Sequence, residues 1–229
     1  MFTGFTDQTI QFFLDLRFHN YTEYFHEHHD RYVETVQQPF YSLIEDLAPA
    51  VQKIDPMMEV RPHKCLSRIH RDTRFSKDKS PYRDHLWFLF RRAGEQREKA
   101  VFLYGEFGPD RLDWGFGIWG ENREAMDIFR KKIEANPLGM MAMIDDMNLP
   151  ARHLGLGGSY FKRMSVPPQV PEKMARWYTA KELYIGKVAP EYSWAFSDRI
   201  CREMKKDFLT LAPIYQTFRG IYDQMNENL

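Results

Sequence analysis

Residues 101–119 have the sequence Val-Phe-Leu-Tyr-Gly-Glu-Phe-Gly-Pro-Asp-Arg-Leu-Asp-Trp-Gly-Phe-Gly-Ile-Trp, and they set the architecture of the chain. The apolar run 101–107 predicts one strand, Gly108-Pro109-Asp110 predicts a turn, and the alternating residues 111–119 predict a second strand. A connection this short joins antiparallel neighbours. Residues 86–90, Leu-Trp-Phe-Leu-Phe, predict a further strand that is covered on both faces. Together these segments predict an antiparallel meander.

The strand expected at 111–119 has two different faces. Its alternation places large side chains on one face, namely Leu112, Trp114, Phe116 and Ile118. Gly115, Gly117 and Trp119 lie on the other face, where the two glycines leave a patch of backbone bare. We therefore expect something bulky against that face, either a packed aromatic ring or helix, or a ligand.

Helical patterns precede and follow the sheet region. Before it, Thr6 and Asn20 are candidate helix caps, and Pro39 kinks a helix or opens the next one. The apolar stripe that follows consists of Phe40, Leu43, Ile44, Leu47 and Val51. The prediction is a single α+β domain, an antiparallel β-meander sheet packed with helices. Its parts are N-terminal helices at 6–54, a sheet region at 59–119 that starts with a strand at 60–69, and a C-terminal helical region at 121–226.

The composition is that of an ordinary globular protein, with 43% hydrophobic and 28% charged residues in a chain of 229. Its 32 Lys and Arg balance its 32 Asp and Glu, which argues against a general binder of nucleic acids or membrane surfaces. Cys65 and Cys201 form no CxxC motif and are predicted to be reduced. No basic leader precedes an apolar core, and no apolar run reaches the ~20 residues of a membrane span. We expect a cytoplasmic protein.

Positive charge gathers at residues 68–83, Arg-Ile-His-Arg-Asp-Thr-Arg-Phe-Ser-Lys-Asp-Lys-Ser-Pro-Tyr-Arg. The surrounding segment 61–92 holds ten Lys and Arg against three Asp, although the whole chain has no net charge. Such a local excess attracts anions, and the planar fork of arginine offers two parallel donors to a phosphate, sulfate or carboxylate. The candidate ligand-binding residues are Arg68, Arg71, Arg74, Lys77, Lys79, Tyr82 and Arg83. The candidate catalytic residues are Asp72 and Asp78, which could orient a cation, bind a metal or act as a base.

The sixteen residues 68–83 resemble the signature of domain-of-unknown-function family 2461, a family of conserved hypothetical proteins. The start of the chain, residues 20–25, the strand 114–119, the helix around Arg130 and residues 161–163 fall in the order expected for that family, so the resemblance covers most of the chain. Small departures are Tyr21 and Tyr24, where the family often has Asn and Trp, and Arg83, where it often has Lys. The resemblance implies an intracellular α+β protein with a cationic loop as its signature. The resemblance implies no particular activity for this chain.

Two other motifs have ordinary explanations. His26, His29 and Asp30 would share a helix face, but the zincin pattern needs His at position 30, and we predict a solvated face and no metal site. The glycine-rich stretch 155–158 lacks the Lys-Ser/Thr of a phosphate loop, so we predict a flexible turn.

Three hypotheses follow for the 68–83 loop. The first is that the cations bind a phosphorylated or otherwise anionic small molecule, which the protein could hydrolyse or transfer through Asp72 or Asp78. The second is single-stranded nucleic acid, with Phe75 and Tyr82 stacking on bases. The third is a non-enzymatic interaction protein in which the loop is an ion-pair brace. The sequence fixes no cofactor, reaction or oligomeric state, and it leaves open whether the protein is an enzyme.

Overall fold

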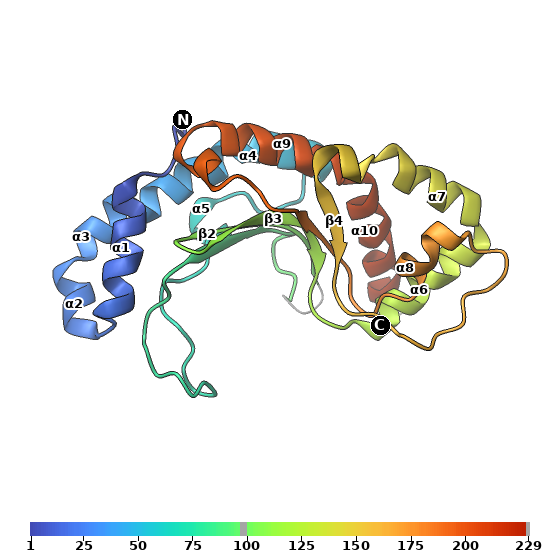
Figure 1. Ribbon diagram of the computed structural model, residues 1–229, viewed down its shortest axis with the longest axis horizontal. Helices are drawn as coiled ribbons and strands as arrows, with labels where there is room; N and C mark the ends of the chain where they lie inside the picture. The colour runs from blue at the N-terminus through green and yellow to red at the C-terminus, as the bar shows by residue number, and fades with distance from the viewer. Residues whose placement is uncertain (97–99, 228–229) are drawn as a thin grey trace. The chain divides into compact units, whose positions relative to one another are not determined.

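The computed structural model describes residues 1–96 and 100–227 (Figure 1). It confirms an α+β fold with an antiparallel sheet. The helices and single helical turns are α1 (Asp7–Phe18), α2 (Thr22–Glu27), α3 (His29–Tyr32), η1 (Val33–Gln37), α4 (Gln38–Ile54), α5 (Pro62–Cys65), α6 (Arg123–Ala135), α7 (Pro137–Asp146), η3 (Leu149–Arg152), η4 (Glu172–Met174), α8 (Ala175–Tyr178), η5 (Tyr192–Phe196), α9 (Arg199–Thr210) and α10 (Ala212–Glu227). The strands are β1 (Leu86–Phe90), β2 (Val101–Gly108), β3 (Arg111–Ile118), β4 (Leu154–Gly157) and β5 (Tyr184–Lys187).

Within the described residues the strands are ordered β1-β2-β3-β5-β4. Strands β1, β2 and β3 fall on the three predicted segments, with ends that differ by at most one residue. Strand β5 pairs antiparallel with both β3 and β4, and its Ile185 lies opposite Phe116 on one side and Leu156 on the other. The region 121–226 was predicted to be helical, so its two strands correct that prediction. Glycine makes up half of β4, which weakens the sequence signal of a strand.

The described residues pack as two compact units. The first consists of Met1–Phe90, Tyr104–Trp114 and Pro190–Lys206, and the second of Arg91–Leu103, Gly115–Ala189 and Asp207–Leu229. Each is described by itself below. The single domain expected from the sequence stays a prediction.

Aromatic rings fill the core of the first unit. Phe5 stacks on Phe107 with ring centroids 4.1 Å apart, and Phe40 packs beside them. Gly105 lets the ring of Phe88 lie on β2, because a Cβ there would come within 2.4 Å of that ring. The five residues of the predicted α4 stripe are each at most 1% exposed, which confirms the stripe. Burial of side chains of this size stabilises the fold by about 1.5–3 kcal/mol each.

Three local predictions in the first unit were wrong. The helix expected from residue 20 onward is not continuous, because it is interrupted at His28 and a π-helical turn, η1, follows. Pro39 then lies in the first turn of α4, one of the two positions expected for it. Asn20 does not cap α2, because its N-cap is Tyr21. Residues 60–69 form no strand: Pro62 starts the single turn α5, and an isolated bridge from Leu66 to Phe88 is what remains of the expected pairing.

The second unit has its own core between α6 and α10, which lie side by side in Figure 1. Phe129 of α6 packs on Phe218 of α10 with centroids 4.8 Å apart. Asn122 caps α6 by accepting a hydrogen bond from the backbone N–H of Ala125 at 3.0 Å. Arg130, whose side chain is 8% exposed, points inward from the same helix and donates to backbone carbonyls that precede β5.

Candidate anion-binding site

The loop at residues 71–81 is closed at its base by backbone pairing. His70 and Tyr82 face each other in an isolated antiparallel bridge. Next to it, the backbone N–H of Arg71 donates to the carbonyl of Pro81 at 2.8 Å. Figure 1 shows the loop as a long excursion (teal) that leaves this base and returns to it. The bridge therefore gives a long, irregular loop a fixed start and end.

Asn20 holds the base of the loop from the side. Its carboxamide accepts from the backbone N–H of Tyr82 at 2.9 Å and donates to the Tyr82 carbonyl at 3.0 Å. The ring of Tyr82 stacks on Phe25 at 4.3 Å and is 3% exposed. Asn20 thus orders the loop base, and Tyr82, a predicted ligand-binding residue, is packed beneath the loop, where a ligand does not reach its ring.

Ion pairs inside the loop hold its tip. Nε and Nη2 of Arg74 lie 3.0 and 2.7 Å from the two carboxylate oxygens of Asp72, a bidentate pair. Arg71 forms an ion pair with Asp78, and Lys79 donates to a loop carbonyl at 2.8 Å. Exposed pairs of this kind contribute little to stability, but they define the path of the loop.

These contacts keep both carboxyl groups ionised. Hydrogen bonds from the Arg74 side chain and backbone lower the pKa of Asp72 to about 2. Hydrogen bonds from Ser80, and then Arg71, lower the pKa of Asp78 to about 2. A carboxylate with such a pKa is a weak base at neutral pH. The predicted role of Asp72 and Asp78 in proton transfer therefore stays a prediction that their pKa values do not favour.

We expect the carboxyl carbon signals of Asp72 and Asp78 to titrate near pH 2 in an NMR experiment. Because these pKa values lie below that of a free aspartate, about 3.9, the contacts stabilise the folded loop above that pH and are lost as the pH falls through about 2. In Arg74→Ala the midpoint of Asp72 should move up toward the ordinary value, while that of Asp78 stays in place. A midpoint for Asp72 that the substitution leaves unchanged would contradict the pairing.

A cavity of about 410 Å³ lies against the base of the loop. Its walls come from the loop, from the residues that lead into β1, and from the first residue of β3. The residues that line it are Arg71, Asp72, Ser76, Arg83, Asp84, His85, Trp87 and Arg111. All of them belong to the first unit. The fold thus brings together three arginines that the sequence separates.

Arg83 is the cation of this cavity that lacks a carboxylate partner among the described residues. Its guanidinium lies over the ring of Trp87 at 4.7 Å, and its Nε is buried without a hydrogen-bond acceptor. Burial, followed by the positive charge of Arg71, lowers the pKa of Arg83 below its ordinary value, and the negative charge of Asp72, which forms no ion pair with Arg83, offsets part of this. By contrast, Arg71 pairs with Asp78, and Arg111 lies 3.2 Å from Glu106. A buried donor without an acceptor favours an anion that supplies one.

His85 lies between two carboxylates on the wall of the cavity. Its Nδ1 is 2.9 Å from Asp84, and its Nε2 is 3.4 Å from Glu106. Burial raises the pKa of the Asp84 carboxyl, but hydrogen bonds from His85 and Arg17 outweigh it, so the pKa is lowered. Gly108 allows the β2–β3 turn to approach, because a Cβ there would come within 2.5 Å of His85. Asp84 therefore stays ionised and can fix the orientation of the imidazole.

The cavity collects three of the residues predicted from the sequence, namely Arg71, Asp72 and Arg83. Those that do not line it are Arg68, Arg74, Lys77, Asp78, Lys79 and Tyr82. Arg68 instead lines a separate cavity of about 260 Å³ beside α3 and α5. The residues that sequence reasoning missed are Ser76, Asp84, His85, Trp87 and Arg111. Asp84 and His85 directly follow the signature, so their position in the sequence could have indicated them. Arg111 could have been found from the predicted meander, because the strand pairing brings it near these two residues.

The histidines at 26–29 do not form one helix face. His28 ends α2, its Nδ1 lies 2.8 Å from the carbonyl of Tyr24, and the two rings stack at 4.1 Å. Among residues 1–96 and 100–227, no group of three or more His, Cys, Asp or Glu is placed to hold a metal ion. In the same residues, no helix is both long enough and apolar enough to cross a membrane.

Comparisons with known proteins place the chain in a family. No curated protein and no solved structure matches it. The model of a conserved hypothetical protein family, DUF2461, matches residues 8–216, a span that includes the loop, the residues that line the cavity and most of each compact unit. Because the match covers most of the sequence, the resemblance seen in residues 68–83 is confirmed, and the chain belongs to the conserved hypothetical protein family DUF2461.

Proposed function

We propose that the protein binds an anionic small molecule, such as a phosphate ester, in the cavity at the base of the 71–81 loop. The observation that carries the proposal is Arg83, a partly buried guanidinium that has no carboxylate partner among the described residues and a buried Nε without an acceptor. A neutral side chain of similar length would pack against Trp87 at a lower cost of desolvation. An anion in the cavity offsets that cost.

The shape of the cavity fits a small ligand. Its volume of about 410 Å³ lies within the range of small-molecule sites. Arg71 and Arg83 come from the two ends of the loop and Arg111 from β3, so oxygen atoms of a phosphate group would meet donors from separate segments. Trp87 supplies an apolar wall for the uncharged part of the ligand. The ligand-binding group proposed is therefore Arg71, Arg83 and Arg111, in place of the whole cationic loop.

A reaction at this site, hydrolysis or group transfer, stays part of the proposal. His85, oriented by Asp84, is better situated than Asp72 or Asp78 to move a proton, because it lines the cavity while the pKa of each of those two carboxyl groups is lowered to about 2. The expected cytoplasmic location is also a proposal, and it is supported by two cysteines, Cys65 and Cys201, that are buried as thiols.

The brace hypothesis is favoured for the tip of the loop, where Arg74 and Lys79 are held by loop groups. It does not account for Arg83. The nucleic-acid hypothesis loses one of its two stacking rings, since Tyr82 is 3% exposed while Phe75 is 94% exposed. We therefore propose that the ion pairs at the tip of the loop stabilise its conformation, and that the ligand binds in the cavity at its base.

A thermal-shift experiment with Arg83→Met tests the proposal. The probes are inorganic phosphate, pyrophosphate and sugar phosphates. A probe at about 100 times its Kd adds about 2.7 kcal/mol, which raises the melting temperature of a protein of this size by several degrees. We expect at least one probe to shift the wild type and to lose that shift in Arg83→Met. Without a ligand, Arg83→Met should melt at or above the wild-type temperature, because a charge without a partner has been removed.

The matched control is Arg74→Met, which removes the same charge from an exposed ion pair at the loop tip. It should keep the full shift. If no probe shifts the wild type and Arg83→Met melts well below it, Arg83 stabilises the free protein and the binding proposal is wrong. Equal loss of the shift in both variants would point to net charge alone, and would also contradict a site at Arg83.

A further inference from the structure

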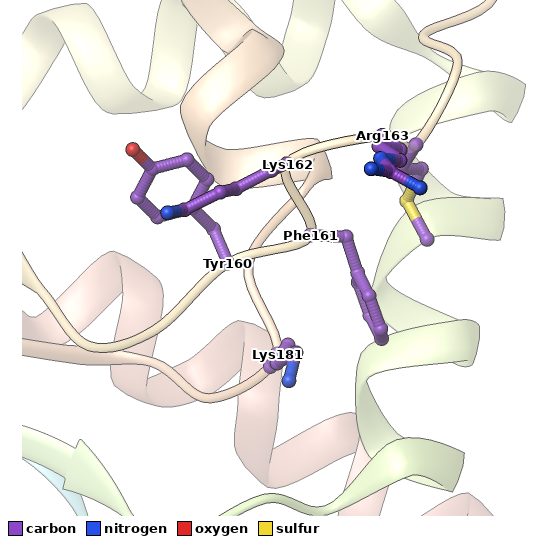
Figure 2. Close-up of a pocket in the computed structure, with 6 residues that line it drawn as sticks. Tyr160, Phe161, Lys162, Arg163 and Lys181 are labelled. Carbon is purple, nitrogen blue, oxygen red and sulfur yellow. The ribbon is translucent and has the colours of Figure 1, made fainter.

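A second cationic surface, on the second unit, carries two aromatic side chains. A shallow cavity of about 620 Å³ is lined by Tyr160, Phe161, Lys162, Arg163, Met164 and Lys181. Three of these residues are cations, two are aromatic, and none carries a carboxylate. Figure 2 shows Lys162 running toward Tyr160, while Lys181 lies on the side of Phe161. All six belong to the second unit, so this surface is independent of the Arg83 site.

Backbone pairing fixes the floor of this surface. Tyr160 and Ala180 form an isolated antiparallel bridge. It is flanked by hydrogen bonds from the N–H of Phe161 to Thr179 at 2.9 Å and from the N–H of Lys181 to a carbonyl of the opposite segment at 3.0 Å. The aromatic residues and Lys181 therefore stand on a paired, two-segment platform, although the residues that follow Phe161 are irregular.

The ring of Tyr160 is supported on one face by a neighbouring side chain. The guanidinium of Arg176 covers one face at 4.2 Å, and Arg176 also donates to the carbonyl of Gly158. Even so, Tyr160 remains 46% exposed. Phe161 is covered more fully, since Lys181 and Arg130 lie over its ring at 5.1 and 5.6 Å. The ring that offers an open face on a fixed support is thus that of Tyr160.

The cations around Tyr160 have few carboxylate partners, although Glu182 lies nearby, where it accepts from the backbone N–H of Ser159 at 2.9 Å. Lys162 and Arg163 form no ion pair with any described residue, and both are exposed. Arg176 has no carboxylate partner among the described residues either, and its Nη1 is buried without a hydrogen-bond acceptor. Lys181 is the exception, with Glu121 at 3.4 Å. A planar group on Tyr160 would therefore lie within a field that favours an attached anion.

We infer that this surface binds a nucleotide, with its base stacked on Tyr160 and its phosphate held by Lys162 and Arg163. Aromatic side chains stack on every base, and cations beside them hold the phosphate. The ligand is a single nucleotide, because only three cations among the described residues line the cavity and the protein has no net charge to follow a longer strand. This inference goes beyond the proposed function and does not depend on it.

Titration calorimetry with adenosine 5′-monophosphate, adenosine and inorganic phosphate tests the inference on the full chain. We expect the monophosphate to bind more tightly than either fragment. Tyr160→Leu should weaken it about tenfold, the usual effect of a lost base–aromatic stack, while Tyr160→Phe keeps the ring and the affinity. The double variant Lys162→Gln/Arg163→Gln, which touches no buried contact, should weaken the monophosphate and leave adenosine unchanged.

Two controls separate this surface from other effects. Lys131→Gln removes a charge from the exposed face of α6 and should leave the affinity unchanged. Every titration is also run in the Arg83→Met background, where a phosphate group bound at the Arg83 site no longer contributes, so failure of either site is seen without the other. The inference is wrong if the monophosphate does not bind, if Tyr160→Leu and the double variant both bind it like wild type, or if affinity rises with each nucleotide added to an oligonucleotide. The last result would favour a strand over a single nucleotide.

Discussion

Asp207→Asn should lower the free energy of unfolding by about 3–5 kcal/mol, the usual result of removing one member of a buried ion pair. Asp207 is fully buried in α9, and its carboxylate serves two cations. One oxygen lies 2.7 and 2.6 Å from Nε and Nη2 of Arg152, and the other lies 3.0 Å from Nζ of Lys187. Lys187 has a side chain only 3% exposed, so its ammonium depends on this carboxylate for charge balance. The amide of asparagine would supply no negative charge and would turn an N–H₂ group toward a cation.

Urea unfolding, analysed by linear extrapolation, measures this loss. Asp145→Asn is the matched control, because Asp145 pairs with Lys173 at the surface and both side chains are about half exposed. Its loss should not exceed about 1 kcal/mol. The double variant Asp207→Leu/Lys187→Met removes both buried charges and should recover most of the lost stability, since Arg152 is 26% exposed and can turn to water. A loss below about 1 kcal/mol in Asp207→Asn would show that water reaches this pair.

This cluster could not be predicted from the sequence. Arg152, Lys187 and Asp207 are separated by long segments without a common pattern, and a strand with Lys at its end ordinarily turns that side chain to water. The meander is the opposite case. Two apolar runs joined by a three-residue turn leave few alternatives, because short connections impose antiparallel pairing and alternation imposes the face. The short connection and the alternation of side chains were therefore sufficient to predict this part of the sheet, and β1 to β3 lie where the sequence predicted them.

The candidate site could be predicted only in part, for a related reason. Composition identified the cationic loop, but it could not separate Arg74, which pairs with its neighbour Asp72, from Arg83, which does not pair. Both are arginines in the same signature, and the difference lies in which carboxylates the folded chain brings near. Likewise Arg111 reaches the cavity through strand pairing, not through proximity in sequence. The residue types therefore predicted a cationic, anion-binding region, whereas the contacts of the folded chain determine which arginines line the cavity.

Gly115→Ala should destabilise the protein by about 3 kcal/mol, the upper part of the range for overpacking. A Cβ built on Gly115 would lie 1.9 Å from the carbonyl oxygen of Ile185 in β5, a contact with backbone that no side-chain rotation can relieve. Gly115 lies opposite Gly186 in the β3–β5 pairing, so two residues without side chains meet where the backbones come closest. Urea unfolding should show a lower midpoint with an unchanged slope.

Gly220→Ala is the control for this prediction. Gly220 lies on the exposed face of α10, and a Cβ there would meet nothing within 4 Å. Because alanine restricts the unfolded chain and favours helix, this variant should gain about 0.5–1 kcal/mol. The same substitution thus has opposite signs at two glycines of one protein, and the sign depends on what faces the missing Cβ. At Gly115 it is the backbone of β5, and at Gly117 it is the ring of Phe102 at 3.0 Å. Both positions are filled by the protein itself, so if Gly115→Ala were neutral, β5 would not lie on β3 as described, and a ligand on that face would again be a valid alternative.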